Sequence, residues 1–278
     1  MKRIVVYSIV VFWLVMAGLF IRREVIPRFF AVPAPGYGSI RAYAQSHPLY
    51  RMGIFAPDEK TRIGTTETTY QLKQDGTCEI NSRTEVDFRK HPLAAMAALP
   101  TGFPADIMKL EIESYATVRP DNALQSFHTT FRSGKLFGMA RGVVQGGSLH
   151  LTVTAGGQVE QRVIPVTKED LIASEFTAIG TLPRPHVGQV WQFKMLDPLK
   201  FEFTTVEAKV TRKTDIQLRG VLYSVYEVEF TQGAYRARAW ADSSGEILKQ
   251  EALQIIMIRE PLPHETPDTL TTEPAAAK

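Results

Sequence analysis

Hydrophobic and polar residues alternate along several segments of the chain, and the alternation predicts β-strands. In residues 77–88, apolar side chains such as Cys78 and Val86 occupy one parity, and charged or amide side chains occupy the other. A period of two is typical of a strand with one buried face. The turn pair Asp75-Gly76 precedes this run, and the threonine-rich run 62–72 precedes the turn. We therefore predict a β-hairpin in this region.

The same pattern continues to the end of the chain, with glycine pairs and other turn residues between the runs. Further strands are predicted over 109–118, 124–131, three segments within 136–166, 190–195, 201–212, 221–231, 234–241 and 247–259. Two short helices are predicted, over 93–99 and 168–178. The expected fold is mainly β, a strongly curved antiparallel sheet with little helix.

The first residues have a different pattern. Ile4 to Ile21 contains no charged residue, and at about 1.5 Å per residue its 18 residues span roughly 27 Å, close to a bilayer core. Trp13 lies within the run, and Arg22 and Arg23 close it. A cleaved signal peptide is the alternative, but the run is long and no A-x-A-like site follows it before Arg22. We expect a retained signal anchor.

These segments divide the chain into four parts. Residues 1–23 are the expected transmembrane anchor, and residues 24–48, with their prolines and glycines, are the expected juxtamembrane linker. Residues 49–260 form the antiparallel β domain, and the proline-rich residues 261–278 are the expected disordered tail. Basic charge is similar on both sides of the anchor, and the free amino terminus favours an inside N-terminus. The expected location is the inner (cytoplasmic) membrane, with the β domain in the periplasm or exterior.

Composition excludes several function classes. The formal net charge is +3, and no nucleic-acid-binding motif is present, so no nucleic-acid partner is expected. Cys78 is the only cysteine, which excludes an internal disulfide and a CxxC metal site. No two of the six histidines are three or four residues apart. No metal site and no cofactor are expected.

Catalytic motifs are also missing. The sequence contains no G-x-S-x-G, P-loop or dinucleotide-binding pattern. Two acidic pairs, Glu111 with Glu113 and Glu227 with Glu229, each lie on one face of a predicted strand, and paired carboxylates perform acid–base chemistry. On strands that alternate with apolar residues, such pairs more often form the solvated face. We expect no catalytic residues and a protein that is not an enzyme.

Aromatic residues in the C-terminal third are the candidate binding residues. They lie at period-two spacing on neighbouring predicted strands: Trp191, Phe193, Phe201, Phe203, Tyr223 and Phe230. The simpler interpretation is a sheet core. The alternative is an apolar groove under a curved sheet, suited to a lipid or another hydrophobic ligand. Sequence alone leaves both interpretations open.

Several hairpin motifs resemble a known class of envelope protein. The runs YRMGIF at 50–55 and RIGTTET at 62–68 are similar to the first strands of bacterial envelope proteins. The later runs VGQVW at 187–191, YEVEF at 226–230 and AWADSSGEILKQE at 239–251 resemble lipoprotein-carrier-like β folds. They are also similar to β domains that precede transglutaminase-like domains. The resemblance implies a half barrel, with two related halves as one arrangement.

The resemblance carries over no catalytic set, because the chain ends at Lys278 and we expect no transglutaminase-like domain. The first hypothesis is a non-catalytic, membrane-anchored envelope protein that binds a hydrophobic ligand or a lipidated partner. The second is an accessory subunit that docks onto a membrane complex or a transglutaminase-like enzyme. A hydrolase with a site assembled from distant strands is the third, and the least favoured.

Overall fold

A computed structural model describes residue 16 and residues 35–90, 109–167, 180–197, 202–233, 235–252 and 254–261. The chain divides into two compact units, Met1–Pro33 and Ala34–Lys278. In the first unit only Met16 is described, so the predicted anchor residues Ile4, Trp13, Ile21, Arg22 and Arg23 lie outside the described residues. Among the helices that are described, none has the length and apolar character needed to cross a membrane.

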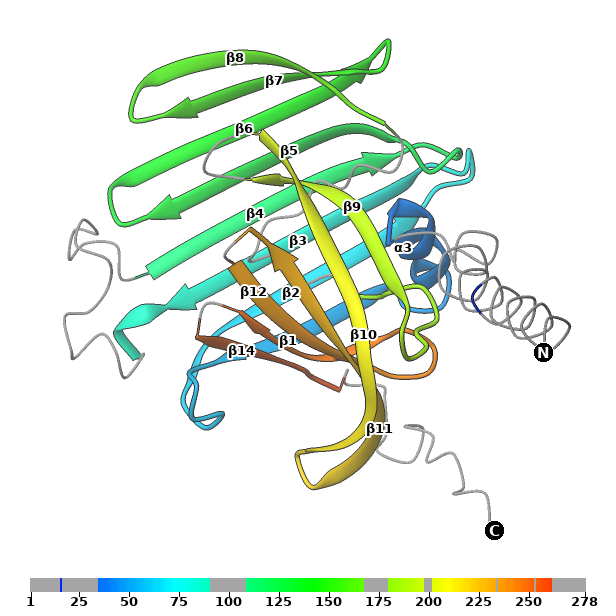
Figure 1. Ribbon diagram of the computed structural model, residues 1–278. Coiled ribbons are helices and arrows are strands. Elements are labelled where there is room, and N and C mark those ends of the chain that lie inside the picture. Colours follow the sequence, from blue (N-terminus) through cyan, green and yellow to red (C-terminus); the bar gives the residue numbers. More distant parts are fainter. Residues whose placement is uncertain are drawn as a thin grey trace, which may run out of the picture. The chain divides into compact units, whose positions relative to one another are not determined.

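The second unit consists of strands in one antiparallel sheet (Figure 1). The strands are β1 (Leu49–Phe55), β2 (Arg62–Leu72), β3 (Cys78–Asp87), β4 (Lys109–Val118), β5 (Leu124–Ser133), β6 (Leu136–Gln145), β7 (Ser148–Ala155), β8 (Gln158–Pro165), β9 (Val190–Asp197), β10 (Glu202–Leu218), β11 (Val221–Gln232), β12 (Tyr235–Ala241), β13 (Ile247–Ala252) and β14 (Ile255–Arg259). Their order is β8-β7-β6-β5-β4-β3-β2-β1-β14-β13-β12-β11-β10-β9. The sheet is not closed, because β8 and β9 are its two edges. The predicted antiparallel, mainly β fold is confirmed.

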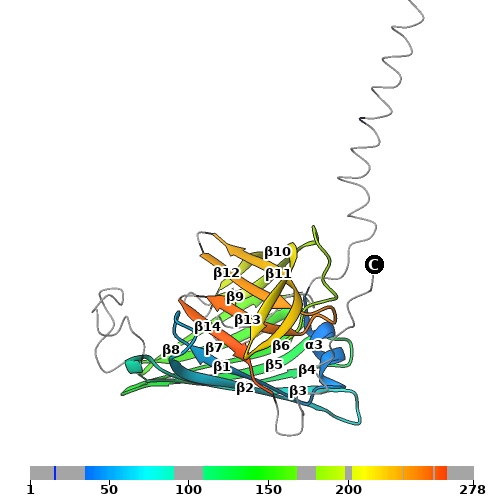
Figure 2. The same ribbon diagram turned by 90° about the horizontal axis from the view of Figure 1, so that it is seen from below.

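Two runs of consecutive strands meet where β1 pairs with β14. We call β1–β8 the N-terminal half-sheet and β9–β14 the C-terminal half-sheet. The sheet folds back at this junction, so that the C-terminal half-sheet lies over one face of the N-terminal half-sheet (Figure 2). We call the two facing surfaces the inner face. The main hydrophobic cluster contains residues of both halves, including Leu151 of β7 and Phe193 of β9.

The N-terminal half-sheet buries one face, as its alternating sequence predicts. In β3 the even-numbered Cys78, Ser82, Thr84 and Val86 are buried, and the odd-numbered residues are exposed or half-buried. The buried polar members pair with hydroxyls of β2: the Thr66 and Thr84 hydroxyl oxygens are 2.8 Å apart. A buried hydroxyl is tolerated only when it is hydrogen-bonded. The inner face of this half therefore includes a row of paired hydroxyls as well as an apolar core.

Two glycines of β6 make room for aromatic rings of β5. Gly138 and Gly142 are directly opposite Phe131 and Phe127. A Cβ at Gly138 would lie 2.0 Å from the Phe131 ring, and one at Gly142 would lie 2.2 Å from the Phe127 ring. Each ring therefore covers the backbone of its neighbour, which fixes the register of this pair of strands.

The C-terminal half-sheet buries both faces. Its outer face carries a second hydrophobic cluster, whose buried members are Leu218, Val225, Trp240, Leu248, Ile256 and Ile258. The distal part of the β10–β11 hairpin supplies Leu218 and Val225 and covers β12–β14. A β-bulge between Val210 and Arg212 precedes this distal part, and bulges bend a strand. The half is therefore a small layered structure in its own right.

Helix α3 (Tyr37–Ala44) packs into the core from the predicted linker. The Tyr43 hydroxyl donates a hydrogen bond of 2.9 Å to Glu246 Oε1, and Arg259 also pairs with this carboxylate. The Tyr43 ring contacts Tyr50 and Tyr70 edge-on at 6.1 and 5.9 Å. Residues 37–44 thus form a helix that buries Tyr37, Tyr43 and Ala44, whereas the prolines and glycines around them predict an irregular tether.

Most predicted strands and turns are confirmed. Gly76 has φ 81°, and the Thr77 amide donates to Asp75 Oδ1 at 2.8 Å, as expected for the Asp75-Gly76 turn. The single strand predicted over 247–259 is wrong: it is the two strands β13 and β14, with Gln254 at φ 61° in the turn. The run contains no Gly, Pro, Asn, Asp or Ser, so the sequence gives no turn signal there. The predicted helices 93–99 and 168–178 lie outside the described residues.

Candidate functional site

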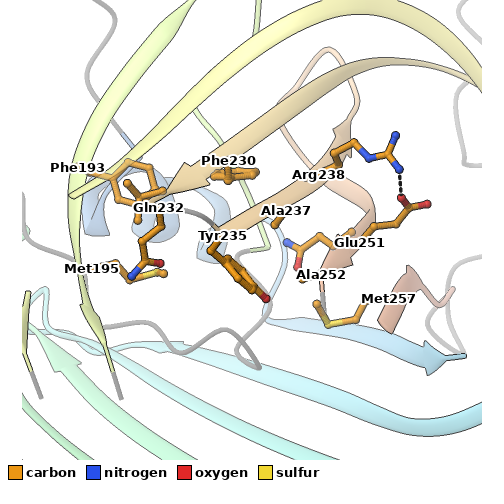
Figure 3. Close-up of a pocket in the computed structure, with 13 residues that line it drawn as sticks. Phe193, Met195, Phe230, Gln232, Tyr235, Ala237, Arg238, Glu251, Ala252 and Met257 are labelled. Carbon is orange, nitrogen blue, oxygen red and sulfur yellow. Dashed lines mark hydrogen bonds and ion pairs between the residues drawn. The ribbon is translucent and has the colours of Figure 1, made fainter. Parts of the chain in front are cut away.

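The candidate site is a pocket on the inner face of the C-terminal half-sheet (Figure 3). Strands β9 to β14 contribute its walls: Phe193, Met195, Val206, Phe230, Gln232, Tyr235, Ala237, Arg238, Ala239, Gln250, Glu251, Ala252 and Met257. Phe193 and Met195 lie on the β9 side, and Met257 lies on the β14 side (Figure 3). Most of the wall is apolar, which is typical of a small-molecule site.

Alanines create the space in this pocket. Strand β12 presents Ala237 and Ala239 to the inner face, and its neighbour β11 presents Phe230 and Val228 opposite them. A methyl group leaves the space that a longer side chain would fill in a close-packed interior. The pocket therefore lies over the small residues of β12, between the larger side chains of the strands on either side.

The pocket is small. Its cavity volume is about 80 Å³. Pockets that enclose a whole drug-sized ligand hold roughly 300–1,000 Å³, whereas an apolar cavity of about 150 Å³ accepts benzene. The pocket therefore suits the apolar end of a ligand, with the rest of the ligand outside it.

The pocket adjoins a groove on the outer face of the same half-sheet. Within the described residues, the last pair of the β12–β13 ladder at this end is Arg238 with Glu251. Ala237 and Ala252, the next residues of the two strands, line both the inner pocket and the groove, whose volume is about 690 Å³. The pocket and the groove are therefore neighbours at this end of β13.

The outer groove is lined by charged side chains. Arg238 donates to Glu251 at 2.7 Å, and Lys249 contacts Glu251 at 3.0 Å and Glu59 at 2.8 Å. Burial alone would lower the pKa of Lys249, but hydrogen bonds to the two carboxylates outweigh it and raise the pKa above its ordinary value. Arg236 also lines the groove and is exposed. The groove is therefore more polar than the neighbouring pocket.

The structure places the predicted aromatic residues in different surroundings. Phe193 and Phe230 line the pocket. Phe203 lines a different cavity of about 200 Å³, together with Leu124 and Val144 of the N-terminal half-sheet. Trp191 is 3% exposed and packs in the main core.

Tyr223 lies on the opposite face of β11, against the second hydrophobic cluster. Phe201 lies outside the described residues. The six aromatic residues are therefore not all parts of one groove.

Sequence reasoning missed several pocket residues, including Met195, Ala237, Ala239 and Met257. A usable signal was present in the run 234–241, AYRARAWA, where alanines alternate with large or charged residues. Alternating small residues on one face of a strand indicate room on that face. Met257 gave no such signal, because it lies in the uniformly apolar run of β14.

The other candidate reactive groups are held in structural roles. Cys78 is buried, and its burial raises the pKa of the thiol, which disfavours the reactive thiolate. Glu111 pairs with Lys109 at 2.6 Å, and Glu227 pairs with Arg212 at 2.8 Å. Within the described residues, no group of three or more His, Cys, Asp or Glu side chains is placed to hold a metal ion.

Comparisons with known proteins found similarity among solved structures alone. No protein-family model matches the chain, and no curated protein matches it. Among solved structures, the chain is similar to a β-barrel-like protein of the domain of unknown function DUF1849 from Brucella abortus. The identity is 9% and the TM-score 0.40, over 76% of this chain and 93% of that chain.

A DUF1089 family protein from Pseudomonas aeruginosa is also similar, with 15% identity and a TM-score of 0.36, over 66% of this chain and 87% of that chain. Neither name states a catalytic activity.

Proposed function

We propose that the chain is a non-catalytic protein that binds a hydrophobic ligand, or the lipid of a lipidated partner, in the inner pocket of the C-terminal half-sheet. The observation that carries the proposal is the apolar wall formed by Phe193, Met195, Phe230 and Met257 over the alanines of β12. Apolar surface of this kind gains about 25 cal/mol for each Å² that a ligand removes from water. The pocket is too small for a whole lipid, so the bound part is the apolar end.

The cell envelope is the proposed location. An uncharged run from Ile4 to Ile21 supports a single-pass anchor in the inner membrane, with residues 49–260 in the periplasm or exterior. The hairpin motifs at 187–191 and 239–251 support a carrier of the lipoprotein-carrier-like type. An anchored domain of this kind is well placed to take an acyl chain that leaves a bilayer.

Native mass spectrometry of the full chain, purified without acyl-chain detergents, tests the proposal. We expect a bound mass that organic extraction removes. Phe230→Ser should reduce the bound fraction at least fivefold, because a hydroxyl replaces a ring in the pocket wall. Tyr223→Ser is the matched control, since Tyr223 lies on the same strand with its side chain on the opposite face. A bound fraction that is absent in the wild type, or equal in both variants, would refute the proposal.

A second candidate function is docking onto a membrane complex through the edge strand β8. Val159 and Val163 are 63% and 64% exposed on this strand, and an unpaired edge is a template for another strand. Inward-pointing charges blunt such edges, and Glu160 and Arg162 form an ion pair of 2.6 Å on β8. We therefore rank docking second. Capture of a partner from envelope extracts by the wild type, and its loss in Val163→Lys, would reverse this order.

A further inference from the structure

We infer that two copies of the chain pair edge to edge through strand β8, antiparallel and centred on Gln161 of each copy. This pairing involves the edge of the N-terminal half-sheet and does not depend on a ligand in the inner pocket. Three features of β8 support it: its exposed edge, the direction of its backbone groups, and the order of its side chains.

Strand β8 is one of the two edges of the sheet (Figure 1). It pairs with β7 on one side, and within the described residues no strand pairs with its other side. Residues 158–161 are all exposed, as are the two valines Val159 and Val163. An exposed edge is a template for a further strand. The free side of β8 is therefore a surface on which another strand can add.

The backbone of β8 directs alternate residues to this free side. The Val166 amide, just beyond the end of β8, donates a hydrogen bond of 3.0 Å to the Gly147 carbonyl. Bonded and non-bonded pairs alternate along an antiparallel ladder. The even-numbered residues of β8 therefore bond to β7, and the N–H and C=O groups of the odd-numbered residues point outward. Pro165, which has no N–H, is at one of these outward positions and leaves the ladder with β7 intact.

The side chains of β8 are ordered symmetrically about Gln161. Residues 159–163 read VEQRV. A second antiparallel copy centred on Gln161 sets each outer valine against a valine, and sets Glu160 against Arg162 at both ends. The outward backbone groups of Gln161 then form a bonded pair. The charged residues meet in the non-bonded pairs, where the Cα atoms are only about 4.5 Å apart and opposite charges stabilise the two strands.

The two charges also select one register. A second copy shifted by two residues in one direction sets Glu160 against Glu160, and in the other direction it sets Arg162 against Arg162. Like charges directly opposite each other destabilise a pair of strands. A shift by one residue sets outward backbone groups against inward ones, so no ladder forms. The charges that oppose an unrelated strand at this edge therefore fit a second copy of the same strand.

Within one copy, Glu160 and Arg162 pair with each other at 2.6 Å. They are directly opposite Val153 and Leu151 of β7, so both lie on the inner side of the strand, and both side chains are partly exposed. Pairing of two copies exchanges these contacts for the same contacts between the copies. The backbone hydrogen bonds and the two valine pairs are then the net gain.

Sedimentation velocity of the full chain over a range of concentrations, without added ligand, measures the pairing. We expect the wild type to form dimers. Glu160→Arg and Arg162→Glu each set like charges against each other, so each should weaken the dimer about tenfold or more. The double variant Glu160→Arg with Arg162→Glu has opposite charges again, in exchanged places, and should dimerise as the wild type does.

A mixture of the two single variants is the sharpest test. One variant then has arginine at both positions and the other has glutamate at both, so we expect a mixed dimer although neither variant pairs with itself. Glu85→Arg is the matched control, because Glu85 and Arg83 form an exposed pair with the same spacing on the internal strand β3. This control should leave the dimer unchanged.

Three results would overturn the pairing. They are a wild type that stays monomeric at the highest concentration, charge reversals that leave the dimer unchanged, and folded single variants whose mixture stays monomeric. Assemblies that grow beyond dimers would also contradict it, because they indicate a head-to-tail contact of β8 with another edge. Thermal unfolding confirms that each variant is folded, and with two reversals and the double variant, one that fails to fold does not decide the result.

Discussion

The two half-sheets share one antiparallel ladder and differ in the number of faces they bury. In the N-terminal half-sheet the outer face is in water, and exposed apolar residues such as Phe137 stand alone there. In the C-terminal half-sheet the β10–β11 hairpin covers the outer face and buries Trp240 and Val225. Because its stability does not depend on the inner face alone, this half can have small residues such as Ala237 and Ala239 on that face. The comparison explains why the pocket lies there.

The largest expected loss of stability distinguishes the outer faces of the two half-sheets. Trp240 is 6% exposed on β12, between the cations of Arg238 and Lys249. Trp240→Ala should lower the free energy of unfolding by about 3–5 kcal/mol, the cost of removing a large buried aromatic side chain. Phe137→Ala, at a residue that is 49% exposed, should change it by less than about 0.5 kcal/mol. Urea unfolding of both variants measures the difference, and equal losses would contradict the contrast.

The next largest loss of stability is expected when a buried ion pair is removed, in contrast to an exposed pair. Glu246 accepts hydrogen bonds from Tyr43 and Arg259, and the Glu246 and Arg259 side chains are 11% and 8% exposed. Glu246→Gln should cost about 3 kcal/mol, because it removes the carboxylate charge that the buried Arg259 guanidinium contacts.

Glu85→Gln is the control in the N-terminal half-sheet. Glu85 and Arg83 form a pair of 2.7 Å, with side chains 35% and 63% exposed. Its loss should cost less than about 1 kcal/mol, because water already screens the two charges. A Glu246→Gln variant as stable as Glu85→Gln in thermal unfolding would show that the buried network does not hold α3 on the sheet.

A smaller effect tests the hydroxyl row of the N-terminal half-sheet. Thr68→Val alone should cost about 1–3 kcal/mol, because the Ser82 hydroxyl then loses the hydrogen bond of 3.1 Å that Thr68 donates. The double variant Thr68→Val with Ser82→Ala should recover most of this loss, since both polar groups are then replaced by apolar groups of similar shape. A double-mutant cycle in urea measures the coupling, and strictly additive losses would contradict the pairing.

The smallest effect on stability is expected from the turn between β1 and β2, which belongs to neither half-sheet. Hydrogen bonds from the Thr61 hydroxyl, the Thr61 amide and the Lys60 amide lower the pKa of Asp58 to about 2. The pKa of Asp58 is lower in the folded than in the unfolded chain. The turn therefore adds to the free energy of unfolding at pH values above the unfolded pKa, and this stabilisation is lost as the pH falls through about 2.

Thr61→Ala removes the largest cause of this shift. An NMR titration of the side-chain carboxyl should then show the Asp58 pKa closer to its ordinary value. An unchanged pKa in Thr61→Ala would assign the shift to the backbone amides alone.

The same contrast explains how far the sequence predicts the structure. Strands β3 and β7 were predictable because each buries one face, so that buried residues such as Cys78 and Val86 recur with a period of two. The run 247–259 was predicted as one strand because both faces are buried in β14, where Ile255 to Ile258 are all buried. Residues 37–44 were predicted as irregular, and the hydrogen bond that anchors Tyr43 of α3 goes to Glu246, 203 positions away.

The candidate site was predictable only in part. The period-two aromatic residues indicated the strands that carry Phe193 and Phe230, but not the face of Tyr223, because that face is decided by the β10–β11 hairpin folding over β12–β14. The outer groove beside the pocket could not be predicted, because it depends on which strands lie side by side. Pairing between strands is a long-range property that the local pattern of either strand does not contain.

Hydrogen–deuterium exchange of the full chain, with and without dodecanoate, tests most directly that the C-terminal half-sheet is the binding half. We expect slower exchange in peptides that cover Phe230–Gln232, Ala237–Ala239 and Gln250–Ala252, and unchanged exchange in β6 to β8. Slower exchange confined to β6–β8, or no change anywhere at a saturating ligand concentration, would contradict this assignment.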